Sequence, residues 1–182
     1  IHEDSKAIVP DDDQFTQRYL AAYLYFSTTA TGDWAGGCAR AKDDEDDTCT
    51  YKRMVNNDPV EYAEVPWSRW LSSVSECEWA GIFCDDSSQF RSIDLSKSKA
   101  ALHWFLTSES VPFAAGINMT GSFPEGITKF SFLQSLNLML NNLEGTLPDS
   151  IVEMPHLLSL ELHGNQFTGT LPEAWYQSRS LQ

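Results

Sequence analysis

The sequence predicts an α/β repeat fold, in which short parallel strands from successive units stack behind a helical, disulfide-containing capping region. Three observations support this prediction: a repeat with a period of 24, a helix-forming segment ahead of it, and four cysteines in the first half of the chain. The 182 residues are enough for one domain with a substantial core. We expect the cap to span residues 1–89 and the repeats to span residues 90–182.

A helix is predicted near the start of the cap. Asp11 is a candidate N-cap, Gln14 lies three residues further on, and acidic groups favour the first turn of a helix. Gly32 is the expected stop signal. Apolar and aromatic residues follow at helical spacing, namely Phe15, Tyr19, Ala22, Tyr23 and Phe26. Because such a stripe usually belongs to a core, we expect it to pack against the first strand of the repeats.

The second half of the chain repeats itself. One stretch is Leu133-x-x-Leu136-x-Leu138-x-x-Asn141-x-Leu143-x-Gly145-x-Leu147-Pro148. The next is Leu157-x-x-Leu160-x-Leu162-x-x-Asn165-x-Phe167-x-Gly169-x-Leu171-Pro172. Leucine and asparagine at these offsets are the signature of leucine-rich repeats. One unit cannot bury its own apolar face, so neighbouring units are expected to stack into a solenoid.

Each residue type in the unit has a physical role. The alternation in residues 136–138 predicts a short strand whose leucines point inward. The amide of Asn141 is expected to bond turn backbone groups that would otherwise be buried unpaired. Gly145 relieves the backbone at the next bend, and Pro148 sets φ where the chain turns towards the convex side. The same roles are expected one unit later.

The first unit is split. Its strand half is Phe90-x-x-Ile93-x-Leu95-x-x-Ser98, and its back half is Met119-x-Gly121-x-Phe123-Pro124. Phe90 lies 43 positions before Leu133 instead of 24, so an insertion of nineteen residues is predicted. At the other end, Leu181 lies one full period after Leu157. We therefore expect a truncated fourth unit and an uncapped end that can serve assembly into a larger protein. The less favoured alternative is that Trp175, Tyr176 and Leu181 close this end themselves.

The inserted segment is unusually apolar for a loop. It contains three aromatic residues, Trp104, Phe105 and Phe113. These side chains either fold back on the flank of the solenoid or form an exposed anchor for a partner, because aromatic residues dominate interface hot spots. We favour packing on the flank.

The Gly-x-Leu-Pro ending resembles the plant-type leucine-rich repeat of receptor-like and secreted proteins. Ahead of the repeats, Cys77-Glu78-Trp79-Ala80-Gly81-Ile82-Phe83-Cys84-Asp85 closely resembles the N-terminal cap signature of that family. The predicted helix followed by Gly32-Asp33-Trp34 is similar to the cap of algal and stramenopile relatives. The resemblance implies that Cys77 and Cys84 form a disulfide and that Trp79 seals the first repeat. It also implies ligand binding on the concave face.

Four cysteines allow three pairings. We favour Cys38–Cys49 with Cys77–Cys84, because each pair closes a local loop and the second fits the family cap. The even count and the absence of a C-x-x-C motif indicate an oxidising compartment, extracellular or lumenal. The cysteine spacings do not match zinc sites, and the acidic run at residues 43–47 lacks the spaced ligands of an EF-hand. We expect no cofactor and no metal, with calcium at the acidic run as the outside alternative.

Composition narrows the set of partners. The chain has 26 acidic and 12 basic side chains and a net charge of −14. That charge disfavours nucleic acid and anionic membranes, which are polyanions. No apolar run approaches the roughly 20 residues that span a bilayer, so any anchor is expected to lie outside these residues. Asn118-Met119-Thr120 is the one N-x-S/T sequon and a candidate glycosylation site.

No catalytic constellation emerges from the sequence. His163 and Glu161 occupy outward positions of one strand, where such a pair can do acid–base work, but no nucleophile or metal motif accompanies them. Phosphate-binding glycine loops, G-x-S-x-G and H-E-x-x-H are absent. We therefore expect a protein that is not an enzyme.

The outward strand positions are the predicted ligand-binding residues. They are Ser92, Asp94, Ser96, Ser135, Asn137, Met139, Ser159, Glu161 and His163. The prediction is a non-catalytic module that binds a protein or glycan and forms part of a larger receptor-like or secreted protein. Two alternatives stay open: an inhibitor of a secreted cell-wall-degrading enzyme, similar to the polygalacturonase-inhibiting proteins, and a structural subunit of a larger assembly.

Overall fold

The computed structural model describes residues 13–29, 34, 48–54, 62–96, 117–171, 173 and 175. Several expectations fall outside them: the Cys38–Cys49 bond, the acidic run at 43–47, the helix signals Asp11 and Gly32, the inserted aromatic residues Trp104, Phe105 and Phe113, and Leu181.

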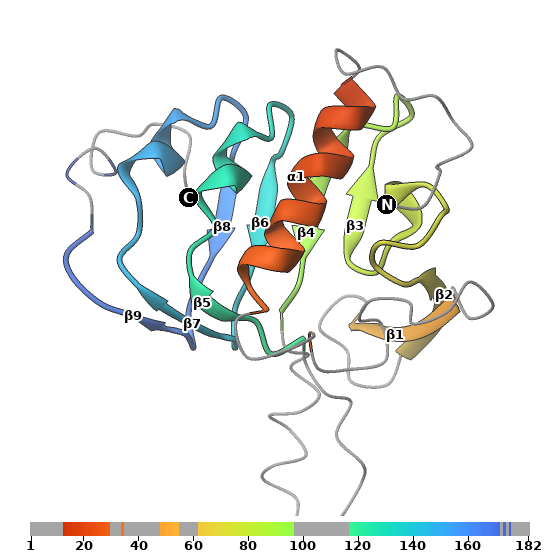
Figure 1. Cartoon of the computed structure of the whole chain (residues 1–182), viewed down its shortest axis with the longest axis horizontal. Coiled ribbons are helices and arrows are strands. Elements are labelled where there is room, and N and C mark those ends of the chain that lie inside the picture. The colour runs from red at the N-terminus through yellow and green to blue at the C-terminus, as the bar shows by residue number, and fades with distance from the viewer. Residues whose placement is uncertain are drawn as a thin grey trace, which may run out of the picture.

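The strands described form three sheets (Figure 1). The strand sheet consists, in spatial order, of β3 (Ile82–Cys84), β4 (Phe90–Asp94), β6 (Ser135–Asn137) and β8 (Ser159–Glu161). The flank sheet consists of β5 (Thr120–Ser122), β7 (Asn142–Gly145) and β9 (Gln166–Phe167). The third sheet is an antiparallel pair, β1 (Thr48–Met54) and β2 (Tyr62–Ser68).

One α-helix and three short 3₁₀-helices complete the elements of the described residues. They are α1 (Asp13–Ser27), η1 (Glu76–Glu78), η2 (Glu125–Lys129) and η3 (Asp149–Glu153). In Figure 1, α1 crosses in front of β4, while β6 and β8 lie behind η2 and the segments around it. The core fills the space between α1 and the strand sheet, because Leu20 and Leu24 of the helix share one buried cluster with Ile93 of β4.

The strand register differs between the two pairs of neighbouring parallel strands of the strand sheet. β4 pairs in parallel with β6, and Ile93 lies opposite Leu136, which is 43 positions later in the chain. β6 pairs in parallel with β8, and Leu136 lies opposite Leu160, which is one regular period later. The paired residues are thus further apart in sequence between β4 and β6 than between β6 and β8.

The turn asparagines bond the backbone as predicted. Asn141 Nδ2 donates to the carbonyl oxygens of Leu95 (2.9 Å) and Leu138 (3.0 Å), and its Oδ1 accepts from the Met119 N–H at 3.0 Å. Asn165 makes the equivalent bonds to Leu138, Leu162 and Leu143. Each amide therefore satisfies groups from its own unit and from the unit before it.

The glycine and proline roles are also confirmed where the chain is described. Gly145 and Gly169 have φ of +83° and +85°, a region in which a Cβ is strained. Pro148, with φ of −77°, precedes η3 and directs the chain away from the flank sheet.

The predicted orientation of α1 is wrong. The aromatic stripe faces outward: Tyr19 is 62% exposed and Phe26 59%, and Phe15 and Tyr23 are also exposed. Of this stripe, Tyr23 lies against η2, where its ring covers Gly126 closely enough that a Cβ there would clash. The opposite face is buried, with Gln17, Leu20, Ala21, Leu24 and Tyr25. The helix begins at Asp13 and ends at Ser27, five residues before the expected stop.

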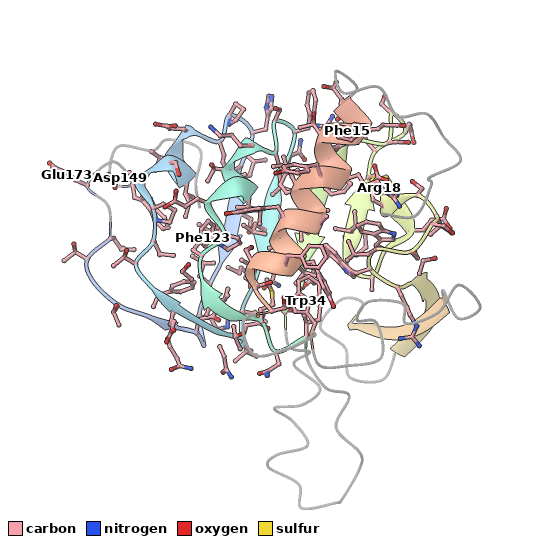
Figure 2. All side chains as sticks on the ribbon, in the orientation of Figure 1. Phe15, Arg18, Trp34, Phe123, Asp149 and Glu173 are labelled. Atoms are coloured by element: carbon pink, nitrogen blue, oxygen red, sulfur yellow. A yellow bond between two sulfur atoms is a disulfide. The ribbon has the colours of Figure 1, made fainter. Side chains whose placement is uncertain are left out.

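Two polar side chains explain this orientation. Gln17 is buried, accepts the Phe90 N–H through Oε1 at 2.6 Å and donates through Nε2 to the Ser88 carbonyl at 3.1 Å. Arg18 donates to the carbonyl oxygens of Ser72 (2.8 Å) and Val74 (2.9 Å), and Figure 2 shows it on the side of α1 that faces β3. These bonds satisfy backbone groups of the cap, so the face of α1 that carries Gln17 turns inward.

Aromatic packing builds the cap. The rings of Tyr25, Trp34, Trp70 and Trp79 form a continuous series, with centroids of successive rings 4.6, 4.7 and 5.5 Å apart. Trp79 is fully buried, and the Arg18 guanidinium lies 5.0 Å from its ring centroid. Trp79 also belongs to the same buried cluster as Ile93 of β4.

The disulfide between Cys77 and Cys84 is confirmed. It joins η1 to β3, and β3 in turn runs antiparallel to β4 at the edge of the strand sheet. In the turn between these strands, N–H groups of Gln89 and Ser87 and the Arg91 guanidinium bond Asp85 and lower the pKa of its carboxyl group. In the described part of the chain, no helix is both long and apolar enough to cross a membrane.

Candidate functional site

The outward face of the strand sheet brings most of the predicted ligand-binding residues together. We call this surface the strand face; it lies on the side of the sheet away from α1. Its first row is Ser92, Ser135 and Ser159, which pair across β4, β6 and β8. Its second row is Asp94, Asn137 and Glu161, paired in the same register. Residues from three separate stretches of the sequence thus form two continuous polar rows.

Two of the predicted residues are not available on this face. Ser96 and Met139 are buried, with 8% and 3% of their surface exposed. Both lie just after the last residue of their strand, where the strand alternation no longer applies. Asp94 Oδ1 accepts the Ser96 N–H at 3.1 Å, and Asn137 Oδ1 accepts the Met139 N–H at 3.1 Å. These two-residue Asx turns bend the chain inward and bury both side chains.

The remaining residues differ in their exposure. The three serines, Asp94 and Asn137 are partly exposed, whereas Glu161 and His163 are exposed. The Asp94 oxygen that bonds Ser96 N–H also accepts from the Ser96 hydroxyl at 2.7 Å, so part of this carboxylate already has a structural role. Glu161 and His163 are therefore the side chains of this face best placed to meet a ligand.

Phe83 is not among the residues that the sequence predicts for the strand face. It lies in β3, which belongs to the predicted cap region but extends the strand sheet by one strand. Phe83 pairs with Ser92, while its neighbour Ile82 is buried opposite Ile93. Phe83 therefore adds an aromatic side chain to the serine row. Its alternation with the buried Ile82 is the signal that could have revealed it.

The strand face is rich in polar groups. It offers hydroxyl, amide, carboxylate and imidazole groups, together with one aromatic ring, and so can hydrogen-bond a polar ligand. Among the described residues, no three His, Cys, Asp or Glu side chains gather as a metal ion would require. The predicted anchor residues Trp104, Phe105 and Phe113 lie outside the described part.

Comparison with known families bears on the repeats directly. Residues 132–154 and 156–177 match the family model described as Leucine Rich Repeat. These two stretches are similar to leucine-rich repeats. The two matched stretches contain the two regular units, and the paired strands β6 and β8 lie within them. No curated protein sequence is significantly similar to the chain.

Several solved structures are similar to part of this chain. The BIR3–SERK2 complex from Arabidopsis thaliana matches at 27% identity over 63% of this chain and 53% of that chain, with a TM-score of 0.47. The BIR2 ectodomain from Arabidopsis thaliana matches at 20% identity over 58% and 46%, with a TM-score of 0.45. The PEPR1–AtPEP1 structure matches at 27% identity over 58% and 16%, with a TM-score of 0.42. This chain thus spans about half the length of the first two matched chains and less of the third.

Proposed function

We propose that this protein is a non-catalytic recognition module that binds a protein or peptide ligand on its strand face. The observation that carries the proposal is the register of β4, β6 and β8, which aligns two polar rows across leucine-rich repeats. A row of hydroxyl groups beside a row of carboxylates and an amide suits a ligand with many hydrogen-bond donors. A peptide backbone and basic side chains both provide them.

The negative charge of the chain indicates that the ligand carries positive charge. Asp94 and Glu161 are the acidic members of the strand face, and the whole chain carries a net charge of −14. Such a surface attracts a basic partner and repels polyanions. The ligand in this proposal is therefore a basic protein or peptide, and neutral glycans are the less favoured class.

The proposed site of action is outside the cell or in a lumenal compartment, as part of a receptor-like or secreted protein. The disulfide between Cys77 and Cys84 supports an oxidising compartment. A standard interface uses about 20–30 residues on each side, more than the strand face provides, so further surface must contribute. Leu158, which precedes β8, and Leu171, which follows β9, are each about half exposed and support such a contribution.

A charge-reversal pair tests this function. The probes are peptides that are selected from a displayed random library for binding to the folded chain. Their affinity is then measured for two variants of the chain. Glu161→Lys reverses a charge on the strand face, and Glu144→Lys reverses an exposed charge on the flank sheet with the same change in net charge. We expect the selected peptides to be basic. We also expect their affinity to fall at least tenfold, which is about 1.4 kcal/mol, in Glu161→Lys and to stay unchanged in Glu144→Lys. An equal loss in both variants would show attraction by net charge and contradict a site on this face.

A further inference from the structure

The sequon Asn118-Met119-Thr120 leads directly into the flank sheet, of which β5 is the first strand. Met119 is fully buried, whereas Asn118 is exposed. The Thr120 N–H donates to the Thr28 carbonyl at the end of α1, at 2.9 Å, which holds this strand in place. The asparagine side chain is thus presented to solvent from a rigid backbone whose next side chain is anchored in the core.

The amide group of Asn118 is oriented for modification. Its Oδ1 accepts from Asn142 Nδ2 at 3.2 Å, and its Nδ2 donates to no group of the described structure. The nitrogen is the atom to which a sugar attaches, and the oxygen is the atom that the fold uses. Attachment of a sugar therefore leaves the bond to the next repeat in place.

We propose that Asn118 carries an N-linked oligosaccharide. In the transfer, a bond forms between Nδ2 and C1 of the first sugar while the bond from C1 to a lipid-diphosphate donor breaks. The diphosphate leaves with the bonding electron pair, and Nδ2 releases one proton. The exposure of Asn118 allows the folded chain to accommodate the product.

A structural role of Asn118 is the competing explanation. Its φ is +53°, in the left-handed region that asparagine tolerates better than most residues. An aspartate at this position would share that tolerance and nearly the same shape but would lack the acceptor nitrogen. The variant Asn118→Asp therefore separates the modification from the backbone requirement.

The position of the sugar has a consequence for binding. Figure 1 shows the flank sheet along the lower side of the molecule, apart from the strand sheet. An oligosaccharide on Asn118 covers the start of the flank sheet and leaves the strand face accessible. Its loss is expected to leave ligand affinity unchanged, so this inference and the proposed function can fail independently.

The test uses the chain secreted from eukaryotic cells behind a signal peptide. Mass spectrometry of the peptide that contains Asn118 is performed before and after digestion with peptide N-glycosidase. We expect a glycan on the wild type, on Thr120→Ser, and on the control Asn142→Asp, which changes the neighbouring asparagine outside the sequon. We expect complete loss of the glycan in Asn118→Asp and in Thr120→Val, which keeps the shape of threonine without its hydroxyl.

The inference is overturned if the secreted wild type, with the Cys77–Cys84 disulfide intact, contains unmodified Asn118. It is equally overturned if the glycan occurs only on aggregated material, because the fold would then exclude the product. Glycan on the cooperatively folded fraction supports it.

Discussion

Asn141 and Asn165 carry hydrogen bonds that join one repeat to the next. Asn141 is almost fully buried, and its bonds reach backbone groups on both sides of the gap between the described residues 96 and 117. Without the amide, the Leu95 carbonyl and the Met119 N–H lose a partner inside the core. Unpaired buried polar groups cost about 1–3 kcal/mol each. One side chain thus holds the split unit together.

Replacing Asn141 by alanine is expected to lower the free energy of unfolding by about 3 kcal/mol, because it leaves buried backbone groups unpaired. The adjacent Asn142 is exposed, and Asn142→Ala is expected to change the value by less than about 0.5 kcal/mol. Urea unfolding followed by tryptophan fluorescence measures both. Equal effects in the two variants would contradict the role given to Asn141.

For single residues, the sequence predicted some roles and not others. The period of the repeat identifies Asn141, Gly145 and Pro148, because each residue type recurs 24 positions later in the sequence. The burial of Met139 was not predicted from the strand alternation, because the Asx turn at Asn137 ends that alternation before Met139.

The helix α1 shows how an element is oriented by its polar contacts. The helix α1 has two apolar faces: the aromatic stripe, and the opposite, aliphatic face that contains Leu20 and Leu24. The aliphatic face also contains Gln17 and Arg18, which bond backbone groups 73 and 54 positions further along the chain. Those partners exist only in the folded cap, so counting aromatic residues along the helix selects the wrong face.

A pair of substitutions on α1 tests this orientation. Leu24→Ala is expected to destabilise the protein by about 2–5 kcal/mol, because Leu24 is completely buried in the core. Tyr19→Ala is expected to cost less than about 0.5 kcal/mol, because that ring is largely exposed. Thermal or urea unfolding measures the difference. A large loss in Tyr19→Ala with little change in Leu24→Ala would restore the orientation expected from the sequence.

Across the whole molecule, the described core is deepest in the middle and thins towards the last repeat. Leu136 is completely buried between β4 and β8, whereas Leu160, one repeat later, is only partly buried. Leu171 is 51% exposed, while its counterpart Leu147 is partly buried. Neighbouring repeats bury each other's apolar residues, and among the described residues this burial decreases towards the last unit.

Matched substitutions test this gradient. Leu136→Ala is expected to lower the free energy of unfolding by about 3–5 kcal/mol, and Leu160→Ala by about half of that, because a partly exposed site loses fewer contacts and can relax. Both variants remove the same atoms at the same position of the repeat. Denaturant unfolding of this chain measures both values, and equal losses would argue that the two repeats are packed alike.

The spacing of leucine, asparagine, glycine and proline was sufficient to predict the repeats and to indicate the split in the first unit. The resemblance of residues 77–85 to the cap signature implied the Cys77–Cys84 bond. These features depend on local geometry or on contacts between neighbouring units, and both leave a periodic trace in the residues. The inward side of α1 and the place of Phe83 on the strand face depend on contacts between segments distant in sequence. Such contacts have no period, and only the folded chain reveals them.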